Sequence, residues 1–352
     1  MMAALVSRSS KAFFAAVIAV FSLIGQPASG EISQLAGNPE IMPVERRDSP
    51  RLEREIQELF ANLPERKAFK IWAPATKHAC AFLAELHGEQ RLFSASANKV
   101  FILCERLRQE DSPSVEEQLI AHELKLDQEV WSIGSTVFNP PNLAGVVNER
   151  TAMEAMITHS DNTATDMVLE EAGADRVRQF IGSIGLTSTM IPDSTRALAG
   201  YLLGAPNYKT ITWDELLSLL GRPFAHPALN DVETLASSAN DLVSFYARAL
   251  QGSFFRNQQT LEQFRRILLL GDITYLVPFP LGSSVFGKAG YFDSPGQHAR
   301  CVAGGMYVLN RWVYFAAILN WDAADVDDPT TVAAFFDALR KAMMLVQGGL
   351  GS

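Results

Sequence analysis

The sequence has little cysteine, no excess of positive charge and no cofactor motif. Cys80, Cys104 and Cys301 allow at most one internal disulfide, and their spacing suggests no metal site, so we interpret them as small buried thiols. Lys and Arg number 30 against 39 Asp and Glu, a net charge of −9, without a basic cluster interleaved with aromatic residues. A general nucleic-acid binder needs a basic face, so that class is excluded.

Other motifs are absent as well. The sequence contains no P-loop, no G-x-G-x-x-G, no G-x-S-x-G and no H-E-x-x-H, although His122-Glu123 begins like the last. What is present is an ordinary globular composition, with 48% hydrophobic and 20% charged residues over 352 positions. Disordered, collagen-like and coiled-coil chains are excluded by this balance. We expect no metal and no cofactor.

Residues 1–30 are predicted to be a secretory signal peptide. Arg8 and Lys11 precede a short apolar run, Ala12–Gly25, and the small residues Ala28–Gly30 follow at the cleavage position. A membrane span needs about 20 apolar residues, so we expect no stable membrane anchor. The hypothesis is therefore a periplasmic or secreted protein.

The rest of the chain is predicted to be α/β (α+β), with strands at both ends and helices between. Residues 31–48 show no pattern and are expected to be a flexible lead-in, whereas 49–350 are expected to form a single domain. Its α/β part covers about 49–95 and 235–350, and its helical part about 96–234. One antiparallel sheet, flanked by helices, is thus expected to be built from both ends of the domain.

Individual elements follow from the spacing of apolar residues. The expected helices cover 50–63, 97–108, 151–158, 163–171, 175–184, 237–250 and 330–346. The expected strands cover 68–73, 79–86, 91–93, 284–292, 299–309 and 312–320, and Cys80–Leu86 fits a helix as well. Residues 188–209 are interrupted by proline and glycine, which favours a long loop or a loop with one short helix.

Three short motifs occur in order along the chain. Ser96–Lys99 is S-x-x-K at the expected start of a helix, Ser160–Asn162 is S-D-N between two helices, and Lys288–Gly290, close to K-T-G, lies in the first C-terminal strand. A serine at a helix N-terminus lies near the positive end of the helix dipole, and a lysine three residues later lies within reach of its hydroxyl. Desolvation beside a second cation lets such a lysine lose its proton and act as a base. Each motif alone is also common on surfaces and in turns.

Together, the three motifs resemble those of the penicillin-recognising serine hydrolases, most closely the class A β-lactamases. Their surroundings match too, with Leu92-Phe93 before the serine, Met156–His159 before S-D-N and Thr163–Thr165 after it. The resemblance covers about residues 69–346. It implies a β-lactamase/transpeptidase-like fold with an all-helical subdomain inserted. We expect a monomer that acts on a small-molecule substrate.

The resemblance also implies roles for the matching residues. Ser96 is the implied nucleophile, Lys99 its general base, and Ser160 the group that passes a proton to the leaving nitrogen. Lys288 is implied to supply a positive field that favours proton loss from Lys99 and Ser160. The implied substrate-binding residues, with the N–H groups of Ser96 and Tyr291 as the oxyanion hole, are Asn162, Lys288, Ala289, Gly290, Tyr291 and Arg300.

Two departures from the family pattern matter. Ala289 stands where the family has Thr or Ser, so a hydroxyl that binds the substrate carboxylate is missing; Arg300 is either its replacement or a solvated residue at the strand edge. The family's Glu-x-x-Leu-Asn, whose Glu activates the deacylating water, is also absent. The corresponding region of this chain, Ile191–Leu198, contains no such motif. Asp193 is the nearest carboxylate, and a turn-forming role suits it better than a catalytic one.

Three functions remain open at this point. The favoured one is a serine hydrolase that hydrolyses a β-lactam or a related amide or ester through an acyl-Ser96 intermediate. The second is a penicillin-binding D-Ala-D-Ala carboxypeptidase or an esterase, and the third is a periplasmic binding protein that stays acylated. His159 is expected to line the site without a catalytic role, and Tyr208 and Trp213 fit core packing better than substrate contact.

Overall fold

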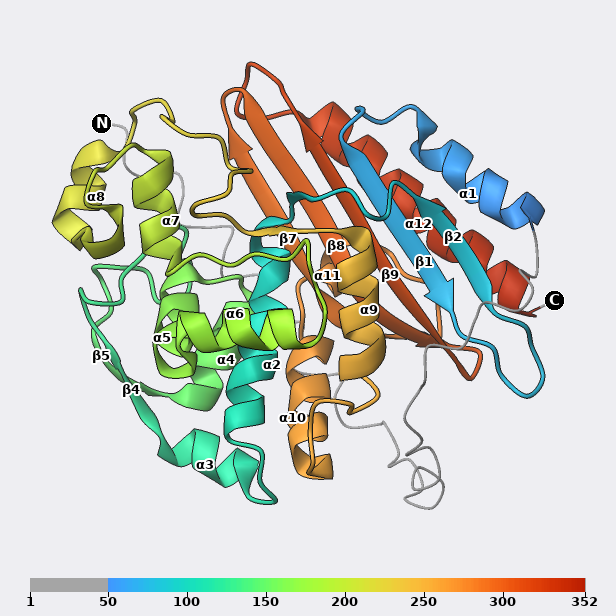
Figure 1. Cartoon of the computed structure of the whole chain (residues 1–352), viewed down its shortest axis with the longest axis horizontal. Coiled ribbons are helices and arrows are strands. Elements are labelled where there is room, and N and C mark those ends of the chain that lie inside the picture. The colour runs from blue at the N-terminus through green and yellow to red at the C-terminus, as the bar shows by residue number, and fades with distance from the viewer. Residues whose placement is uncertain (1–49, 352) are drawn as a thin grey trace, which may run out of the picture. The chain divides into compact units, whose positions relative to one another are not determined.

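The computed structural model describes residues 50–351, so the predicted signal peptide and lead-in lie outside the described residues. The beginning and the end of this part together form the main sheet and the helices that cover one of its faces (Figure 1). Its first elements are α1 (Pro50–Ala61), β1 (Lys67–Ala73) and β2 (Phe82–Leu86). Its last elements are β7 (Ser284–Ser294), β8 (Gln297–Val308), β9 (Arg311–Trp321) and α12 (Pro329–Gly351).

These five strands form one antiparallel sheet in the order β2-β1-β9-β8-β7. Strand β1 from the beginning of the domain pairs with β9 from its end, in a register that places Ile71 opposite Phe315. The prediction that a sheet is built from both ends is confirmed. Strand β7, which carries Lys288, is an edge strand with only β8 beside it.

Side chains alternate across the sheet and fill a core on each face. On one face the strands pack against α1 and α12 through a cluster that includes Ile56, Phe69, Ile71, Phe315, Phe335 and Leu339. The neighbouring residues along each strand point to the other face, where Cys301, Tyr314 and Ala316, for example, pack with the helical part of the chain. The sheet is therefore covered by helices on both faces, as expected.

The segment between β1–β2 and β7 is mainly helical (Figure 1). Its helices are α2 (Lys99–Gln109), α3 (Val115–Ala121), α4 (Glu149–Thr158), α5 (Asn162–Ala172), α6 (Ala174–Ser183), α7 (Thr195–Leu202), α8 (Trp213–Leu219), α9 (Ala239–Ala249), α10 (Gln258–Leu269) and α11 (Ile273–Leu276). Several begin at a short polar residue whose side chain accepts a backbone N–H three residues later, namely Asn148, Asp161, Ser194, Thr212 and Ser238. No helix among residues 50–351 is long and apolar enough to cross a membrane.

Three short strands, β4 (Glu123–Leu126), β5 (Gly145–Asn148) and β6 (Ala236–Ser237), were not predicted. β4 pairs with β5, and β6 pairs with β3 (Leu92–Phe93), which lies in the expected strand 91–93. Strands this short carry too few residues for a period to be recognised. Helix α10 was missed although its buried residues Leu261, Phe264 and Ile267 follow helical spacing.

The expected loop at 188–209 contains one α-helix, α7, and the short 3₁₀ turn Tyr208–Thr210. The expectation that the cysteines are buried holds for Cys104 and Cys301, whose thiols form no disulfide. It is wrong for Cys80, which is exposed because it lies in the connection between β1 and β2 rather than in a strand.

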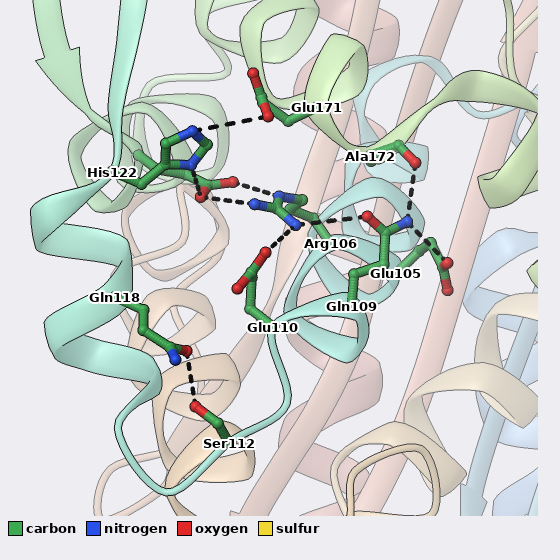
Figure 2. Close-up of polar contacts among 10 residues, drawn as sticks. Glu105, Arg106, Gln109, Glu110, Ser112, Gln118, His122, Glu171 and Ala172 are labelled. Carbon is green, nitrogen blue, oxygen red and sulfur yellow. Dashed lines mark hydrogen bonds and ion pairs between the residues drawn. The ribbon is translucent and has the colours of Figure 1, made fainter.

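A buried ion pair joins α2 to the start of α4 (Figure 2). Arg106 donates from Nε to Glu149 Oε1 at 2.6 Å and from Nη2 to Glu149 Oε2 at 3.1 Å. Glu149 is fully buried, and His122 Nδ1 lies 2.9 Å from its Oε2. Glu110 accepts a further hydrogen bond from Arg106 at 2.6 Å. This network fixes α2, the helix that follows Ser96, against α4, the helix that leads to Ser160.

Glu149→Ala is expected to lower the free energy of unfolding by about 3 kcal/mol, because it leaves the Arg106 guanidinium buried with one carboxylate fewer. Urea denaturation followed by circular dichroism measures the change. The control is Asp322→Ala, which removes an exposed ion pair with Arg66 and is expected to cost less than about 1 kcal/mol. Equal losses in the two variants would contradict this account.

Candidate active site

Ser96 lies in a 3₁₀ turn, Ala95–Asn98, that leads directly into α2. The residue before it, Ala95, has φ +49°, a left-handed conformation that is strained for a residue with a side chain. The N–H groups of Ser94 and Ala95 both donate to the carbonyl of Leu235, at 2.8 and 3.2 Å. This turn places the half-buried Ser96 at the N-terminal end of a helix, as predicted.

Two buried asparagines hold this turn in place. Asn98 accepts a hydrogen bond from Ser94 Oγ at 2.7 Å and donates to the carbonyls of Met190 and Ala236. Asn320 on β9 pairs with the backbone of Phe93, accepting its N–H and donating to its carbonyl, each at 2.9 Å. Neither residue was predicted, because Asn98 occupies a variable position of S-x-x-K and Asn320 stands in an apolar strand.

Lys99 is completely buried and contacts the S-D-N segment. Its Nζ donates to the Ser160 carbonyl at 2.5 Å, to Asn162 Oδ1 at 2.7 Å and to Ser160 Oγ at 3.4 Å. Burial and the nearby Lys288 ammonium lower the pKa of Lys99 to about 7, although carboxylates oppose the shift. A sizeable share of this amine is therefore neutral at neutral pH. No hydrogen bond joins Lys99 Nζ and Ser96 Oγ within residues 50–351.

The S-D-N segment is fixed by its middle residue. Asp161 caps α5 by accepting the N–H of Ala164 at 2.9 Å, and its other oxygen accepts the N–H groups of Val137 and Phe138 at 2.9 and 3.0 Å. With the carboxylate held in this way, Ser160 adopts a left-handed backbone with φ +56°. Asp161 therefore has a positioning role that the motif analysis did not assign.

Asn162 is oriented from both ends of its amide. Its Oδ1 accepts from Lys99, and its Nδ2 donates to the Ile133 carbonyl at 2.7 Å. Gly134, with φ +78°, leaves room for this amide, because a Cβ there would lie 2.8 Å from Asn162 Nδ2. One hydrogen of Nδ2 remains for a ligand, which is consistent with the predicted substrate-binding role.

Lys288 is also completely buried, and it turns toward a carboxylate that sequence reasoning missed. Its Nζ forms an ion pair with Asp272 and donates to the Ala289 carbonyl at 2.8 Å. Asp272 Oδ1 accepts the Ala289 N–H at 2.8 Å, so one carboxylate binds both residues. Burial lowers the pKa of Lys288, and Asp272 opposes this. Within the described residues, no hydrogen bond joins Lys288 to Ser160.

The two neighbours of Lys288 along β7 differ in their environment. Ala289 is 1% exposed and packs in the cluster between the sheet and α12, together with Val302 and Ile273. Gly290 lies against the Ser96 turn, where a Cβ would come within 2.1 Å of the Ser94 carbonyl oxygen and 3.0 Å of Ser96 N. Only glycine permits this close approach of β7 to the turn.

The N–H of Tyr291 is directed toward the open side of β7. The N–H of Ala289 bonds to Asp272 rather than to β8, and N–H groups two residues apart on a strand point the same way. The Tyr291 N–H thus leaves the sheet edge next to Gly290, the residue that packs against the Ser96 turn. This arrangement supports the predicted oxyanion hole, and the Tyr291 side chain is half exposed.

Arg300 lies opposite Tyr291 in the β7–β8 ladder but is bound within the chain. Both of its terminal nitrogens contact the Asp293 carboxylate, each at 2.9 Å, and Nη1 also donates to the Ala299 carbonyl at 2.8 Å. His298 Nδ1 lies 3.0 Å from the same carboxylate. The guanidinium fork is therefore already filled by a carboxylate of the protein itself.

The region 191–198 itself has one carboxylate, Asp193, and the carboxylates of Asp166 and Glu233 contact its backbone. Asp193 forms ion pairs with Arg178 at 2.5 Å and Lys209 at 2.9 Å, as its predicted structural role suggests. Burial raises the pKa of Asp193, but these two cations outweigh it and hold the pKa below its usual range. Because its pKa is lowered and both of its oxygens are paired with cations, the Asp193 carboxylate is poorly suited to act as a base.

Asp166, one turn after Asn162 on α5, is the second carboxylate and was not predicted. It accepts the backbone N–H groups of Thr195 and Arg196, at 2.6 and 3.0 Å, and so caps α7. Burial raises the pKa of Asp166 to about 6. Thr195 Oγ1 in turn donates to Ser132 Oγ at 2.8 Å, which joins α7 to the segment before α4.

Trp213 is buried against Trp131, so the expectation of core packing holds for it, and the partly buried Tyr208 packs edge-on against Tyr201. His159 is exposed at the C-terminal end of α4. Among residues 50–351, no group of three or more His, Cys, Asp or Glu is arranged to hold a metal ion.

Solved structures share this fold over most of the chain. PBP-A has a TM-score of 0.63 and 18% identity, with 88% of this chain and 98% of that chain covered. A β-lactamase from Chitinophaga pinensis DSM 2588 has a TM-score of 0.64 and 13% identity, with 85% and 99% covered. A β-lactamase from Xanthomonas campestris pv. campestris has a TM-score of 0.63 and 13% identity, with 87% and 99% covered.

These low identities establish the fold, and no curated protein matches the sequence. The family itself is shown by sequence: the model of the β-lactamase enzyme family matches residues 51–335, which include all three motifs. The resemblance inferred from the motifs is thereby confirmed. With a match over most of its length, the chain belongs to the β-lactamase enzyme family.

Proposed function

We propose that this protein is an exported serine hydrolase that cleaves a β-lactam or a related small amide or ester through an acyl-Ser96 intermediate. The observation that carries the proposal is the buried Lys99, one helical turn after Ser96, whose pKa of about 7 provides a neutral amine at neutral pH. Membership of the β-lactamase enzyme family supports the same chemistry.

Acylation begins with the neutral Lys99 amine, which takes the proton from Ser96 Oγ as this oxygen attacks the substrate carbonyl. The N–H groups of Ser96 and Tyr291 stabilise the oxyanion, and Asn162 holds the substrate amide. Ser160 Oγ, 3.4 Å from Lys99 Nζ, passes the proton to the leaving nitrogen or oxygen as its bond to the carbonyl carbon breaks. An ester or linear amide thus gives the acyl-Ser96 ester and a free alcohol or amine, whereas the protonated nitrogen of an opened β-lactam ring stays attached to the acyl group.

Hydrolysis of the ester needs a base for water, and the family's Glu-x-x-Leu-Asn is absent. Asp193 is held in ion pairs with Arg178 and Lys209, and Asp166 is used to cap α7. Lys99 is neutral again once the leaving group has taken its proton, so it can serve as the base for the water. Deacylation is therefore proposed to be slower than acylation.

The absence of Glu-x-x-Leu-Asn also favours a second candidate, a protein that stays acylated. If Lys99 cannot reach the water, the acyl-Ser96 ester persists and the protein acts as a binding protein rather than as a hydrolase. The two functions share the acylation step, so they differ only in the lifetime of the adduct.

The first prediction concerns the nucleophile. Incubation with a penicillin or with a p-nitrophenyl ester is expected to add one acyl group to the wild-type protein, as measured by intact-protein mass spectrometry. Ser96→Ala is expected to show no adduct, whereas Ser112→Ala, which changes a partly exposed serine in the connection before α3, is expected to behave as wild type. An adduct that decays as product accumulates supports the hydrolase, a lasting adduct supports the second candidate, and an adduct on Ser96→Ala refutes both.

The second prediction is the pH dependence of acylation. Because the base is the neutral form of Lys99, the acylation rate constant is expected to fall about tenfold per pH unit below pH 7 and to level off above it. Stopped-flow measurements between about pH 5 and 9 determine the profile. Lys99→Arg, which keeps the charge but provides no base, is expected to slow acylation by about 10³-fold.

Asp166→Asn is the control for this profile, since Asp166 has a pKa of about 6. Removing its negative charge lowers the pKa of Lys99, so the midpoint is expected to move to lower pH while the falling limb remains. Loss of the limb in Asp166→Asn would assign the titration to Asp166 and contradict the role of Lys99.

A further inference from the structure

Both cations that the motif pattern offers to a substrate carboxylate are already neutralised inside the protein. Lys288 is completely buried and forms its ion pair with Asp272, whose side chain is also almost fully buried. The second oxygen of Asp272 accepts the backbone N–H of Ala289, which fixes the carboxylate beside the ammonium. A ligand that used Lys288 would have to compete with a preorganised buried carboxylate.

Arg300 is neutralised in the same way by a different residue. Asp293 occupies both arms of its guanidinium, and the Ala299 carbonyl takes another of its N–H groups. The guanidinium also lies over the ring of Trp321, 5.6 Å from its centre, and the side chain is only 12% exposed. His298, buried and stacked on the same Trp321 ring, contacts Asp293 as well.

Within residues 50–351, the charged side chains with the largest effects on the pKa of Lys99 are Lys288 and three carboxylates, Asp161, Asp166 and Asp272. Ala289 adds no hydroxyl, and its side chain packs in the apolar cluster with Val302. A ligand carboxylate beside β7 would thus lose its hydration without gaining a free cation, which is unfavourable.

We infer that the subsite beside Lys288 and Arg300 takes an uncharged group, so that the substrates are neutral esters or amides rather than acids with a carboxylate at this position. The inference rests on the proposed acyl-Ser96 chemistry and specifies its substrate class. Neutral groups pay no such desolvation cost, and Asn162 and the two oxyanion-hole N–H groups bind the acyl part of either kind of substrate.

The test compares penicillin G with penicillin G methyl ester, two compounds that differ only in this carboxylate. The second-order rate constant for acylation of Ser96, measured by intact mass and stopped flow, is expected to be at least about 10-fold higher for the methyl ester. Equal rates, or faster reaction of the free acid, would overturn the inference.

Two variants test whether the internal carboxylates Asp293 and Asp272 cause the preference for the methyl ester. Asp293→Asn frees Arg300 and Asp272→Asn frees Lys288, so each is expected to lower the ester-to-acid ratio of rate constants by about 10-fold through faster reaction of the free acid. Asp322→Asn, which removes the same charge from an exposed position paired with Arg66, is expected to leave the ratio unchanged. Asp293 is partly exposed, so Asp293→Asn keeps the test available if the buried Asp272→Asn does not fold.

An unchanged ratio in both folded variants, or an equal change in Asp322→Asn, would overturn the inference. Absence of a Ser96 adduct with either compound would refute the proposed function and this inference with it. A Ser96 adduct combined with a preference for the free acid would refute the inference alone.

Discussion

Burial of the Lys99 side chain is the constraint on which the rest of the site depends. An ammonium group without solvent must find acceptors, and the structure supplies the Ser160 carbonyl and Asn162 Oδ1. Those acceptors are in place because Asp161 fixes the S-D-N segment through three backbone N–H groups. The same burial that requires these partners also lowers the pKa of Lys99, so packing and chemistry have one cause.

The sequence was sufficient to predict the sheet, most helices and the elements that carry the motifs. Apolar spacing located α1, α2, α9 and α12, and the strands of the C-terminal meander, because each pattern is local. The order of the motifs then indicated which residues gather, and Lys99, Ser160 and Asn162 do so. Gly290 illustrates why one motif position is fixed, since its contact with the Ser96 turn excludes any side chain.

The missed residues act across elements that are far apart in the chain. Asp272 precedes α11 and binds Lys288 on β7, and Asn320 on β9 binds the backbone of Phe93. Asp166 on α5 caps α7 by accepting the N–H groups of Thr195 and Arg196. Nothing in the local spacing marks such residues, because their partners are brought to them only by the fold. The partner of Arg300 is local by contrast, since Asp293 lies seven residues before it and the register of the β7–β8 hairpin brings the two side chains together.

The pairing of β1 with β9 has a consequence for how the molecule is assembled. The turn with Ser96 is synthesised early, whereas β7, β8 and β9 are among the last elements of the chain. The sheet therefore joins segments with a large separation in sequence, and loop-closure entropy makes such contacts slow to form. Until the last strands dock, Gly290 and the Tyr291 N–H are absent from the turn. Ser96 thus gains its full surroundings only in the final stage of folding.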